Sequence, residues 1–325
     1  MVLVSLLIFV VLLLIFLGNF IMDFIKRRKS ETKYHLRETI LAFVLLAPAV
    51  LLTFFFVLLP IFFSLGYAFT DFDLLKPLEI NPVGFKNFIT IFTEYKEHLA
   101  IYSAVKNTLF FVFLVVPIQI TLALLLALFC NNKRRGTIVF KICFFAPVAI
   151  SLTVASFFWL TLLSPADDGI MNTVLSYFGI SAHDFLGNKD TVMIWIVIIS
   201  AWQGCGYQML IFLSALGNIR KDLYEAASID GANVFQRFFT ITLPGLRPTF
   251  LYILITVFVG ACRVMIQPMI LTGYDTNSLT MSYFMYVRAF DDGHIGESCT
   301  VALMMTILIG AITFVQRKLL GEKKK

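Results

Sequence analysis

Residues 104–129 read AVKNTLFFVFLVVPIQITLALLLALF, an apolar run whose single charged side chain, Lys106, lies near its start. An α-helix rises about 1.5 Å per residue, so about 20 consecutive apolar residues cross the hydrocarbon core of a bilayer. We therefore expect a transmembrane helix here. Six other stretches meet the same criterion: Val2–Met22, Thr39–Leu65, Ile142–Leu163, Val192–Leu216, Thr249–Leu271 and Cys299–Gln316.

The composition excludes a soluble fold. Of the 325 residues, 59% are hydrophobic and 14% are charged, whereas a soluble domain has about 25% charged residues. The sequence thus predicts an all-α, polytopic membrane protein with about seven transmembrane helices. The net charge is +6, but the basic residues stand in short clusters between apolar runs, so we expect no nucleic-acid partner. The cysteines and histidines are scattered and form no CxxC or HExxH pattern, so no metal site is predicted.

Charged residues indicate the orientation. Of the 26 lysines and arginines, 19 lie in residues 23–38, 130–141, 217–247 and 317–325, while 13 of the 20 acidic residues lie in the three long loops of the opposite side. Cytoplasmic loops carry the excess of Lys and Arg. We expect a protein of the cell membrane with its N-terminus outside and its C-terminus in the cytoplasm. The cluster Lys26–Lys29 follows the first apolar run, so Val2–Met22 is interpreted as a retained helix rather than a secretory signal.

The segment 217–248, GNIRKDLYEAASIDGANVFQRFFTITLPGLRP, is polar and amphipathic. It predicts two short helices: Asn218 caps the first, Asn233 caps the second, and Pro244 ends the second. Gly231 between them allows the positive φ of a tight turn. Such a helix pair is a compact knob that fits a groove on a partner and transmits rigid-body motion. The alternative is a plain amphipathic loop on the lipid headgroups.

The residues of this segment look like a known motif. An acid followed by two small residues, then an Asp-Gly-Ala corner and a Leu-Pro end, resembles the EAA motif of ABC importer permeases. The residues that match are Glu225, Ala226, Ala227, Asp230, Gly231, Ala232, Leu243 and Pro244. In that family the loop docks on a cytoplasmic ATPase, so the resemblance implies that these residues couple the chain to an ATPase.

Other stretches resemble the carbohydrate-uptake branch of the same family, the MalF/UgpA-like subunits. They are Asn107–Leu109, Phe145–Pro147, Asp168–Asn172, Gln267–Met269 and Leu271–Gly273, followed by Tyr283, Tyr286, Ala289 and Phe290. The resemblance implies the six-helix core of a type I ABC importer with one additional N-terminal helix.

The family pattern implies that the chain has four parts. Residues 1–38 are the extra helix and a basic connector, 39–103 the first core helix and an extracellular loop, 104–316 the importer transmembrane domain with its EAA loop at 217–248, and 317–325 a basic cytoplasmic tail.

The resemblance also implies a function and partners. The chain is expected to form half of the translocation path for a carbohydrate, an oligosaccharide or related sugar, together with a second homologous permease. The other expected partners are an ATPase dimer, an extracytoplasmic solute-binding protein and the lipid membrane. The chain has no GxxxxGK phosphate loop, so ATP and Mg²⁺ are expected on the ATPase, and neither a cofactor nor enzymatic activity is expected in this chain. Gly204 and Gly206 lie in an apolar run and indicate close helix packing instead.

Polar side chains inside the predicted spans are candidates for the transport path, because such groups are costly in lipid. Arg263 is the one charged residue deep in a span, and Gln267, four residues later, is expected on the same helix face. Amide, guanidinium and aromatic groups suit a hydroxyl-rich ligand, so we assign Arg263, Gln267, Gln203, Tyr207 and Gln119 to the path. A structural role stays open, since such groups often only bond to a neighbouring helix and Arg263 can pair with an outer-loop acid.

Other functions also stay open. One is a permease for another solute, such as a phosphorylated polyol or a peptide-like compound. Another is a membrane scaffold that binds a partner and transports nothing. A secondary transporter is disfavoured, because the sequence shows neither paired inverted halves nor a deep carboxylate suited to proton coupling.

Overall fold

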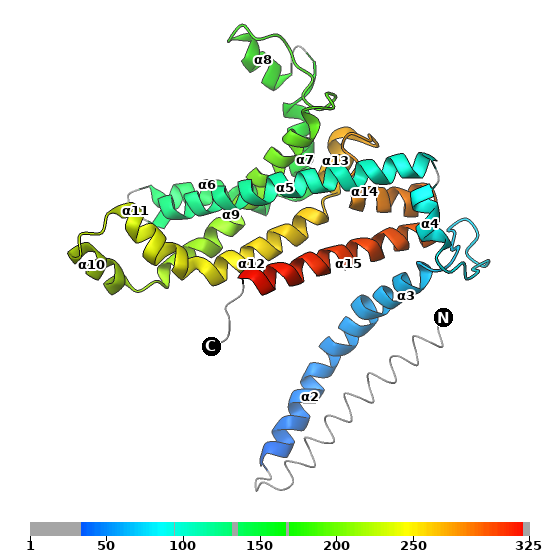
Figure 1. Ribbon diagram of the computed structural model, residues 1–325, viewed down its shortest axis with the longest axis horizontal. Coiled ribbons are helices and arrows are strands. Elements are labelled where there is room, and N and C mark those ends of the chain that lie inside the picture. Colours follow the sequence, from blue (N-terminus) through cyan, green and yellow to red (C-terminus); the bar gives the residue numbers. More distant parts are fainter. Residues whose placement is uncertain (1–33, 94, 132–135, 167–168, 321–325) are drawn as a thin grey trace. The chain divides into compact units, whose positions relative to one another are not determined.

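The computed structural model describes residues 34–93, 95–131, 136–166 and 169–320. The predicted first span, Val2–Met22, lies outside these residues. The chain divides into two compact units: the first holds the described residues up to Ile89 together with Arg288–Leu303, and the second holds Thr90–Val287 together with the residues from Met304 onward. Figure 1 shows the order of the helices.

The first unit begins with a long apolar helix. α2 (Tyr34–Thr53) continues through a π-helical turn, η1 (Phe54–Leu58), into α3 (Leu59–Tyr67). Pro60 explains the wide turn, because proline has no N–H to donate and its ring collides with the carbonyl four residues earlier. Residues 43–67 are long and apolar enough to cross a membrane. The predicted span over residues 39–65 is thus confirmed as an apolar helix.

Three long helices form the core of the second unit. α5 (Tyr95–Asn131), α9 (Val192–Gly217) and α12 (Leu243–Cys262) pack against one another and run side by side in Figure 1. Apolar side chains from all three are buried between them, among them Phe111, Ile120, Ile196, Met209, Phe212, Leu246 and Ile253. The predicted spans over 104–129 and 192–216 are confirmed, and α5 extends further at its N-terminal end.

Two glycines of α9 allow its neighbours to approach closely. A Cβ on Gly204 would lie 2.1 Å from Nε2 of Gln119 on α5. A Cβ on Gly206 would lie 2.1 Å from the backbone oxygen of Phe144, on the adjacent helix α6 (Thr137–Ala149). The backbone oxygen of Phe144 cannot move away, so Gly206 must be glycine, whereas a side chain at position 204 would force the flexible Gln119 amide aside. The predicted role of these glycines in close helix packing is confirmed.

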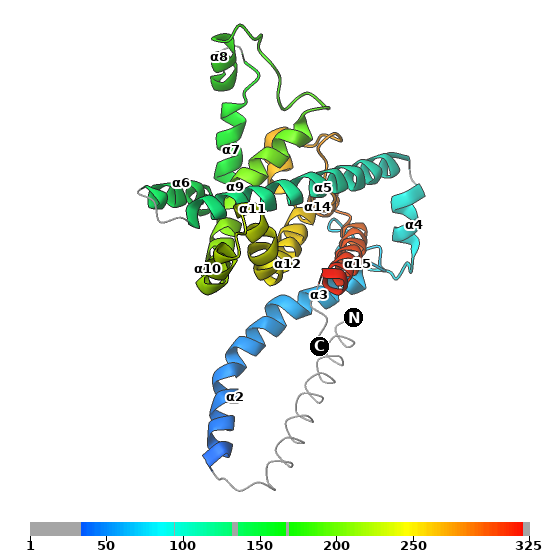
Figure 2. The same ribbon diagram turned by 60° about the vertical axis from the view of Figure 1, so that its left-hand side comes forward.

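The predicted span over 142–163 is wrong as a single straight helix. α6 and α7 (Leu152–Leu162) are bent by 101° relative to each other, as Figure 2 shows. Ser151 starts α7 by accepting a hydrogen bond from the N–H of Val154 at 3.3 Å. The apolar composition of the run predicts burial in lipid but does not show where a local cap restarts a helix.

The predicted span over 249–271 is displaced along the chain. One continuous helix runs over residues 234–262, through α11 (Val234–Arg237), a π-helical turn η2 (Phe238–Thr242) and α12. The prediction that Pro244 ends a helix is wrong, because Pro244 lies in the first turn of α12, directly after the widened turn. The helix ends at Cys262, and the short α13 (Ile266–Thr272) follows a break.

The remaining elements are α4 (Lys86–Thr93), α8 (Ile170–Ser176), α10 (Lys221–Ile229), α14 (Met281–Tyr286), the π-helical turn η3 (Val287–Asp291) and α15 (Ile295–Leu320), which contains the predicted span 299–316. Within the described residues, five helices are long and apolar enough to cross a membrane, and the bent α6–α7 pair makes a sixth if it crosses as one span. The all-α, polytopic fold is confirmed, whereas the described part of the chain does not reach the predicted seven spans.

Candidate functional site

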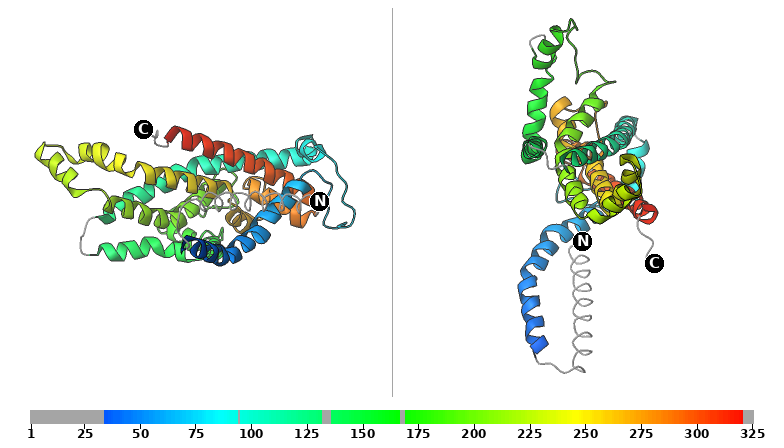
Figure 3. Two further views of the ribbon diagram at one scale, coloured as in Figure 1. Left: turned by 90° about the horizontal axis from the view of Figure 1, so that it is seen from below. Right: turned by 90° about the vertical axis from the view of Figure 1, so that its left-hand side faces the viewer.

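The two short helices of the 217–248 segment meet at a tight corner, beyond one end of α9 and α12 (Figure 3, left). α10 ends at Ile229, and Gly231 follows with a φ of +78°. A Cβ on Gly231 would meet nothing within 4 Å. Glycine is therefore favoured here by the backbone conformation and not by lack of space. The predicted glycine corner is confirmed.

Backbone hydrogen bonds close this corner. The N–H of Asp230 donates to the carbonyl of Ala226 at 3.0 Å, and the N–H of Ala232 donates to the carbonyl of Ala227 at 2.9 Å. Two carbonyls of the last turn of α10 thus have backbone partners within the corner. The structure brings these four residues together with Gly231, while the side chain of Glu225 is exposed on α10.

The caps of the two helices differ from each other. Asn233 starts α11 as predicted: its side chain accepts from the N–H of Gln236 at 2.9 Å, and its own N–H donates to the Gln236 side chain at 2.7 Å. The predicted cap by Asn218 is wrong, because Asn218 terminates α9 instead. Arg220 precedes α10 and forms an ion pair with Asp222, and this contact lowers the pKa of the Asp222 carboxyl below its ordinary value.

Two side-chain contacts tie α10 to the helix that follows it. Nη1 of Arg237 donates to Oγ of Ser228 at 2.8 Å. The hydroxyl of Tyr224 lies 2.9 Å from that of Thr242, which is buried at the end of η2. Because η2 continues into α12, these contacts connect the corner to a membrane-spanning helix. Sequence patterns had not singled out these four side chains.

The corner exposes apolar side chains. Ile229 is 87% exposed and Phe235 is 77% exposed, with Val234 exposed between them. We call these three residues the corner surface. Contiguous exposed apolar residues commonly mark a contact site.

Leu243 and Pro244 lie away from the corner, in the first turn of α12. Pro244 lines a hollow of about 480 Å³ between the end of α9, α10 and α12, with Ile219 and Leu223 among its walls. A Cβ on the neighbouring Gly245 would lie 3.0 Å from Cδ1 of Ile219. The eight motif residues therefore form two groups, one at the corner and one at its base.

Two predicted path residues, Gln203 and Gln119, are buried around α9. Nε2 of Gln203 donates to the carbonyl of Ile150 at 3.2 Å, at the break between α6 and α7. Its Oε1 atom is buried and has no hydrogen-bond partner among the described residues. Gln119 approaches α9 from α5, against Gly204. Both amides therefore lie between helices.

Gln267 is also buried, on α13. Its Nε2 atom donates to Oγ of Ser200 at 3.2 Å, and that hydroxyl donates to the carbonyl of Ile196. Like Gln203, Gln267 thus makes an interhelical hydrogen bond. This geometry fits the structural role that the sequence left open.

Arg263 and Tyr207 are placed differently. Arg263 lies at the C-terminal end of α12, directly before the break, and its side chain is exposed, whereas the sequence placed it inside one continuous helix. Gln267 follows the break on α13, so the two residues do not share a helix face. Tyr207 is half exposed on α9 and lines a second hollow of about 470 Å³, with Phe145 and Ile211.

Residues after the break in α12 are folded against α5. The amide of Asn107 donates to the carbonyls of Thr276 and Leu279 at 2.9 and 3.0 Å. The hydroxyl of Thr108 accepts from the N–H of Met281 at 2.9 Å. In the sequence, Asn107 and Thr108 are a polar pair inside an apolar run. Their hydrogen-bond partners could not be inferred, because residues 276–281 are far away in the chain.

Hydroxyl groups also satisfy carbonyls near this break. Thr280 donates to the carbonyl of Val264 at 2.6 Å, and Ser282 donates to that of Cys262 at 3.4 Å. The break therefore leaves few polar groups without partners, as burial in a membrane protein requires.

Comparison with known proteins identifies the family. The family of binding-protein-dependent transport system inner membrane components matches residues 87–325. The chain belongs to this family. This inner membrane component is 30% identical to the arabinooligosaccharides transport system permease protein AraP of Bacillus subtilis, over 86% of this chain and 88% of the relative. It is 29% identical to the trehalose/maltose transport system permease protein MalF of Thermococcus litoralis, over 88% and 96% of the two chains.

Solved structures resemble the inner membrane component over most of its length. One chain of a bacterial ABC transporter involved in the import of the acidic polysaccharide alginate aligns with a TM-score of 0.78 at 22% identity, covering 90% of this chain and 99% of that chain. A bacterial alginate ABC transporter in complex with an alginate pentasaccharide-bound periplasmic protein aligns with a TM-score of 0.76 at 21% identity, over 88% and 96% of the chains. The fold is therefore that of an ABC transporter membrane subunit.

Proposed function

We propose that this inner membrane component forms half of the translocation path of an ATP-driven importer for a carbohydrate, an oligosaccharide or related sugar. Family membership and the names of the two relatives, which concern oligosaccharides and disaccharides, support this substrate class. A second homologous permease forms the other half of the path. An extracytoplasmic solute-binding protein delivers the sugar, and a pair of separate ATPase subunits binds ATP and Mg²⁺.

The observation that carries the proposal is the corner between α10 and α11. It is closed by hydrogen bonds, tied to α12 through Tyr224 and Thr242, and exposes the corner surface. A rigid knob that is continuous with a membrane-spanning helix can transmit the closing motion of an ATPase dimer to the helices. Glu225 is exposed on α10 for an ion pair or hydrogen bond with the ATPase.

The orientation follows from charge. The corner, the basic tail and the segment 130–141 face the cytoplasm, and the N-terminus lies outside. The chain performs no chemistry itself. Residues 39–103 contain the first core helix and its outer loop, 104–316 the conducting domain, and 317–325 the tail.

The five path residues contribute to conduction unequally. Tyr207 is open to a hollow, so it is the best placed of the five to meet a hydroxyl-rich solute, whereas the amide of Gln203 is buried between helices. Gln119 and Gln267 support the packing around α9, and Arg263 lies beside the break where a solute would enter.

Transport by the reconstituted complex tests the function. The complex is placed in proteoliposomes with ATP inside and with radiolabelled arabinotriose or maltose presented by the co-encoded solute-binding protein. We expect uptake that requires ATP and persists when ionophores remove ion gradients. Uptake driven by an ion gradient would indicate a secondary transporter, and an assembled complex that transports no solute would indicate a scaffold. Uptake of glycerol 3-phosphate or of a peptide, without uptake of either sugar, would show that the substrate is not a carbohydrate.

The coupling role has its own test. Glu225→Lys or Gly231→Pro is expected to lower solute-stimulated ATP hydrolysis and uptake together, by at least tenfold. Asp190→Lys, an equivalent change of an exposed acid outside the segment, is the control. Unchanged uptake and ATP hydrolysis in both corner variants would rule out the coupling role.

A further inference from the structure

A closed ring of hydrogen bonds joins α10 to the widened turn η2. Oγ of Ser228 donates to the backbone carbonyl of Tyr224 at 2.7 Å, and Nη1 of Arg237 donates to the same Oγ at 2.8 Å. The hydroxyl of Thr242 donates to the backbone carbonyl of Arg237 at 3.5 Å and lies 2.9 Å from the hydroxyl of Tyr224. We call these four residues the polar ring; α10 and α11, which contribute three of them, lie at the left of Figure 1.

The protons of the polar ring have one consistent arrangement. A guanidinium only donates, so the Ser228 oxygen accepts from Arg237 and uses its own proton for the Tyr224 carbonyl. Because Thr242 uses its proton for the Arg237 carbonyl, the phenol of Tyr224 donates to Thr242. Hydrogen bonds in such a connected chain polarise and strengthen one another. The loss of one hydroxyl therefore weakens the whole ring.

Thr242 lies at the weakest point of the long helix over residues 234–262. It is the last residue of η2, where the N–H of Leu243 bonds to the carbonyl of Phe238, five positions back. A π-helical turn of this kind is a place where helices bend. Thr242 is only 5% exposed, and α12 begins with the next residue. The polar ring thus braces the one widened turn between the corner and α12.

The polar ring is separate from the corner surface. Ile229, Val234 and Phe235 are exposed and contribute no side-chain atom to the ring. Thr242 is buried, and Tyr224 is half-buried on the side of α10 that faces η2. Their hydroxyls are therefore placed to hold two parts of this chain together, and the corner surface stays open for another protein.

We propose that Tyr224 and Thr242 are positioning residues for transport, whose hydrogen bond fixes the angle between α10 and α12. With this bond, a displacement of the corner moves the membrane-spanning helix as one body. Without it, η2 bends and absorbs part of the displacement. ATP hydrolysis continues, because the corner surface is intact, but each hydrolysis moves less solute. The inference rests on the proposed function, in which the corner follows an ATPase.

The test measures the amount of solute taken up per ATP hydrolysed by the complex in proteoliposomes. The probe is radiolabelled maltose or arabinotriose, whichever the wild-type complex takes up. Tyr224→Phe removes one oxygen atom, and Thr242→Val replaces the hydroxyl by a methyl group of similar size. Each is expected to lower the ratio about fivefold, the factor by which one hydrogen bond changes an equilibrium. Thr242→Ser keeps the hydroxyl and is expected to stay within about twofold of the wild type.

Two control variants on α12 match these changes. Thr256→Val removes a hydroxyl whose bonds, among the described residues, are to carbonyls of its own helix, those of Tyr252 and Ile253 at 3.0 and 3.1 Å. Tyr252→Phe removes the hydroxyl of a half-exposed tyrosine. Neither variant touches the polar ring, so both are expected to leave the ratio unchanged.

Two results would overturn the proposal. One is an unchanged ratio in Tyr224→Phe and Thr242→Val; if the valine variant does not assemble, Tyr224→Phe decides alone. The other is an equal fall of uptake and ATP hydrolysis, because a constant ratio indicates weaker docking of the ATPase and not a lost angle. If the wild-type complex imports sugar and the ring variants keep its ratio, only the positioning inference fails. If the wild-type complex imports neither sugar with ATP, the proposed function fails first.

Discussion

The α10–α11 corner and the α3–α4 loop are two tight turns that each expose apolar side chains, and they differ in how far along the chain their stabilising contacts reach. Every bond of the corner joins residues within about twenty positions of one another, from Tyr224 with Thr242 down to Asn233 with Gln236. The loop has local bonds as well, such as those of Asp71 with Asn81, but it adds contacts across more than two hundred positions, such as that of Phe72 with Gly296. A local turn forms from its own sequence, whereas a long-range turn requires the fold around it.

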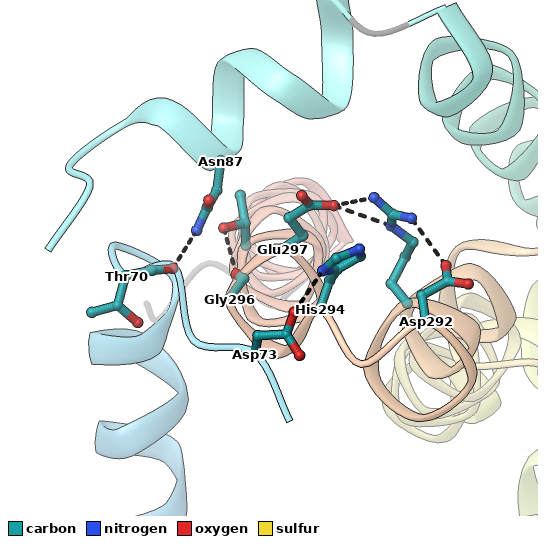
Figure 4. A network of polar contacts seen from close by, with 9 residues as sticks. Thr70, Asp73, Asn87, Asp292, His294, Gly296 and Glu297 are labelled. Atoms are coloured by element: carbon teal, nitrogen blue, oxygen red, sulfur yellow. Dashed lines mark hydrogen bonds and ion pairs between the residues drawn. The ribbon is translucent and has the colours of Figure 1, made fainter. Parts of the chain in front are cut away.

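This difference predicts how each region responds to loss of a single contact. In the corner, a substitution should loosen only neighbouring amides. In the loop, removal of the Asn87 side chain, which donates to the carbonyl of Ala68 and to that of Thr70 (Figure 4), should loosen the neck formed by residues 70–71 and 81–83. Hydrogen exchange of backbone amides, measured by mass spectrometry on the complex in nanodiscs, reports both.

The largest effect is expected for Asn87→Leu. The change removes two hydrogen bonds and leaves the buried carbonyl of Thr70 with one donor fewer, which costs about 2 kcal/mol. Amides of the neck, Asp71 and Val83, should then exchange roughly 30-fold faster. Asn277→Leu, at an exposed asparagine, is the control and should change exchange little. Effects confined to residues adjoining position 87 would contradict the bracing of the neck by Asn87.

Gly231→Ala should have the next largest effect. Its φ of +78° is costly for any residue with a Cβ, by about 1–2 kcal/mol. Amides of residues 230–237 should exchange about tenfold faster, while those of the neck of the α3–α4 loop stay as in the wild type. Gly310→Ala is the control and should change exchange little. That glycine lies within α15, and a Cβ there would also meet nothing within 4 Å. Equal behaviour of the two alanine variants would mean that the corner does not need its glycine.

Asn233→Ala should weaken the corner less. The substitution removes the side-chain oxygen that accepts from the N–H of Gln236, while the N–H of residue 233 can still donate to the Gln236 side chain, and loss of an N-cap costs about 1 kcal/mol. We expect about fivefold faster exchange at the amides of Gln236 and Arg237. Asn233→Asp keeps a cap acceptor and should restore most of the protection. If Asp and Ala behave alike, the side-chain cap contributes nothing here.

The smallest effect concerns two exposed carboxyl groups, one in each region. Hydrogen bonds from Asn81 lower the pKa of Asp71 below its ordinary value of 3.8, and the ion pair with Arg220 lowers that of Asp222. The folded state favours the ionised form of both carboxyl groups. Their contribution to the free energy of unfolding is therefore complete above pH 3.8 and is lost as the pH falls below that value. Carboxyl carbon-13 shifts during a pH titration measure both groups.

Salt separates these two carboxyl groups. Raising the salt concentration should return the Asp222 pKa toward its ordinary value, because an exposed ion pair is screened. Asp71 should change less, because its partners are a neutral N–H and a neutral amide. Asn81→Ala should raise the pKa of Asp71 and leave that of Asp222 unchanged. An equal salt response in both groups would show that a charge, and not Asn81, holds Asp71.

Local features of the candidate site were predictable from the sequence, and distant ones were not. The cap by Asn233 and the turn at Gly231 depend on residues within a few positions, and both are confirmed. The cap assigned to Asn218 is wrong because the preceding helix α9 extends through Gly217 and uses Asn218 as its own terminus. The shared face of Arg263 and Gln267 is wrong because hydroxyl groups of Thr280 and Ser282, far along the chain, satisfy the carbonyls at the break.

The sequence by itself determined that the protein is helical and lies in a membrane, since both follow from composition and from the length of each apolar run. It also determined the family motif and the position of the corner. Only the tertiary structure decided where α12 breaks, which amides bridge helices around α9, and that the start of α15 holds the α3–α4 loop. The physical reason is that apolar length is a property of one segment, whereas a break, a bridge or a braced loop depends on hydrogen-bond partners that the fold brings from elsewhere in the chain.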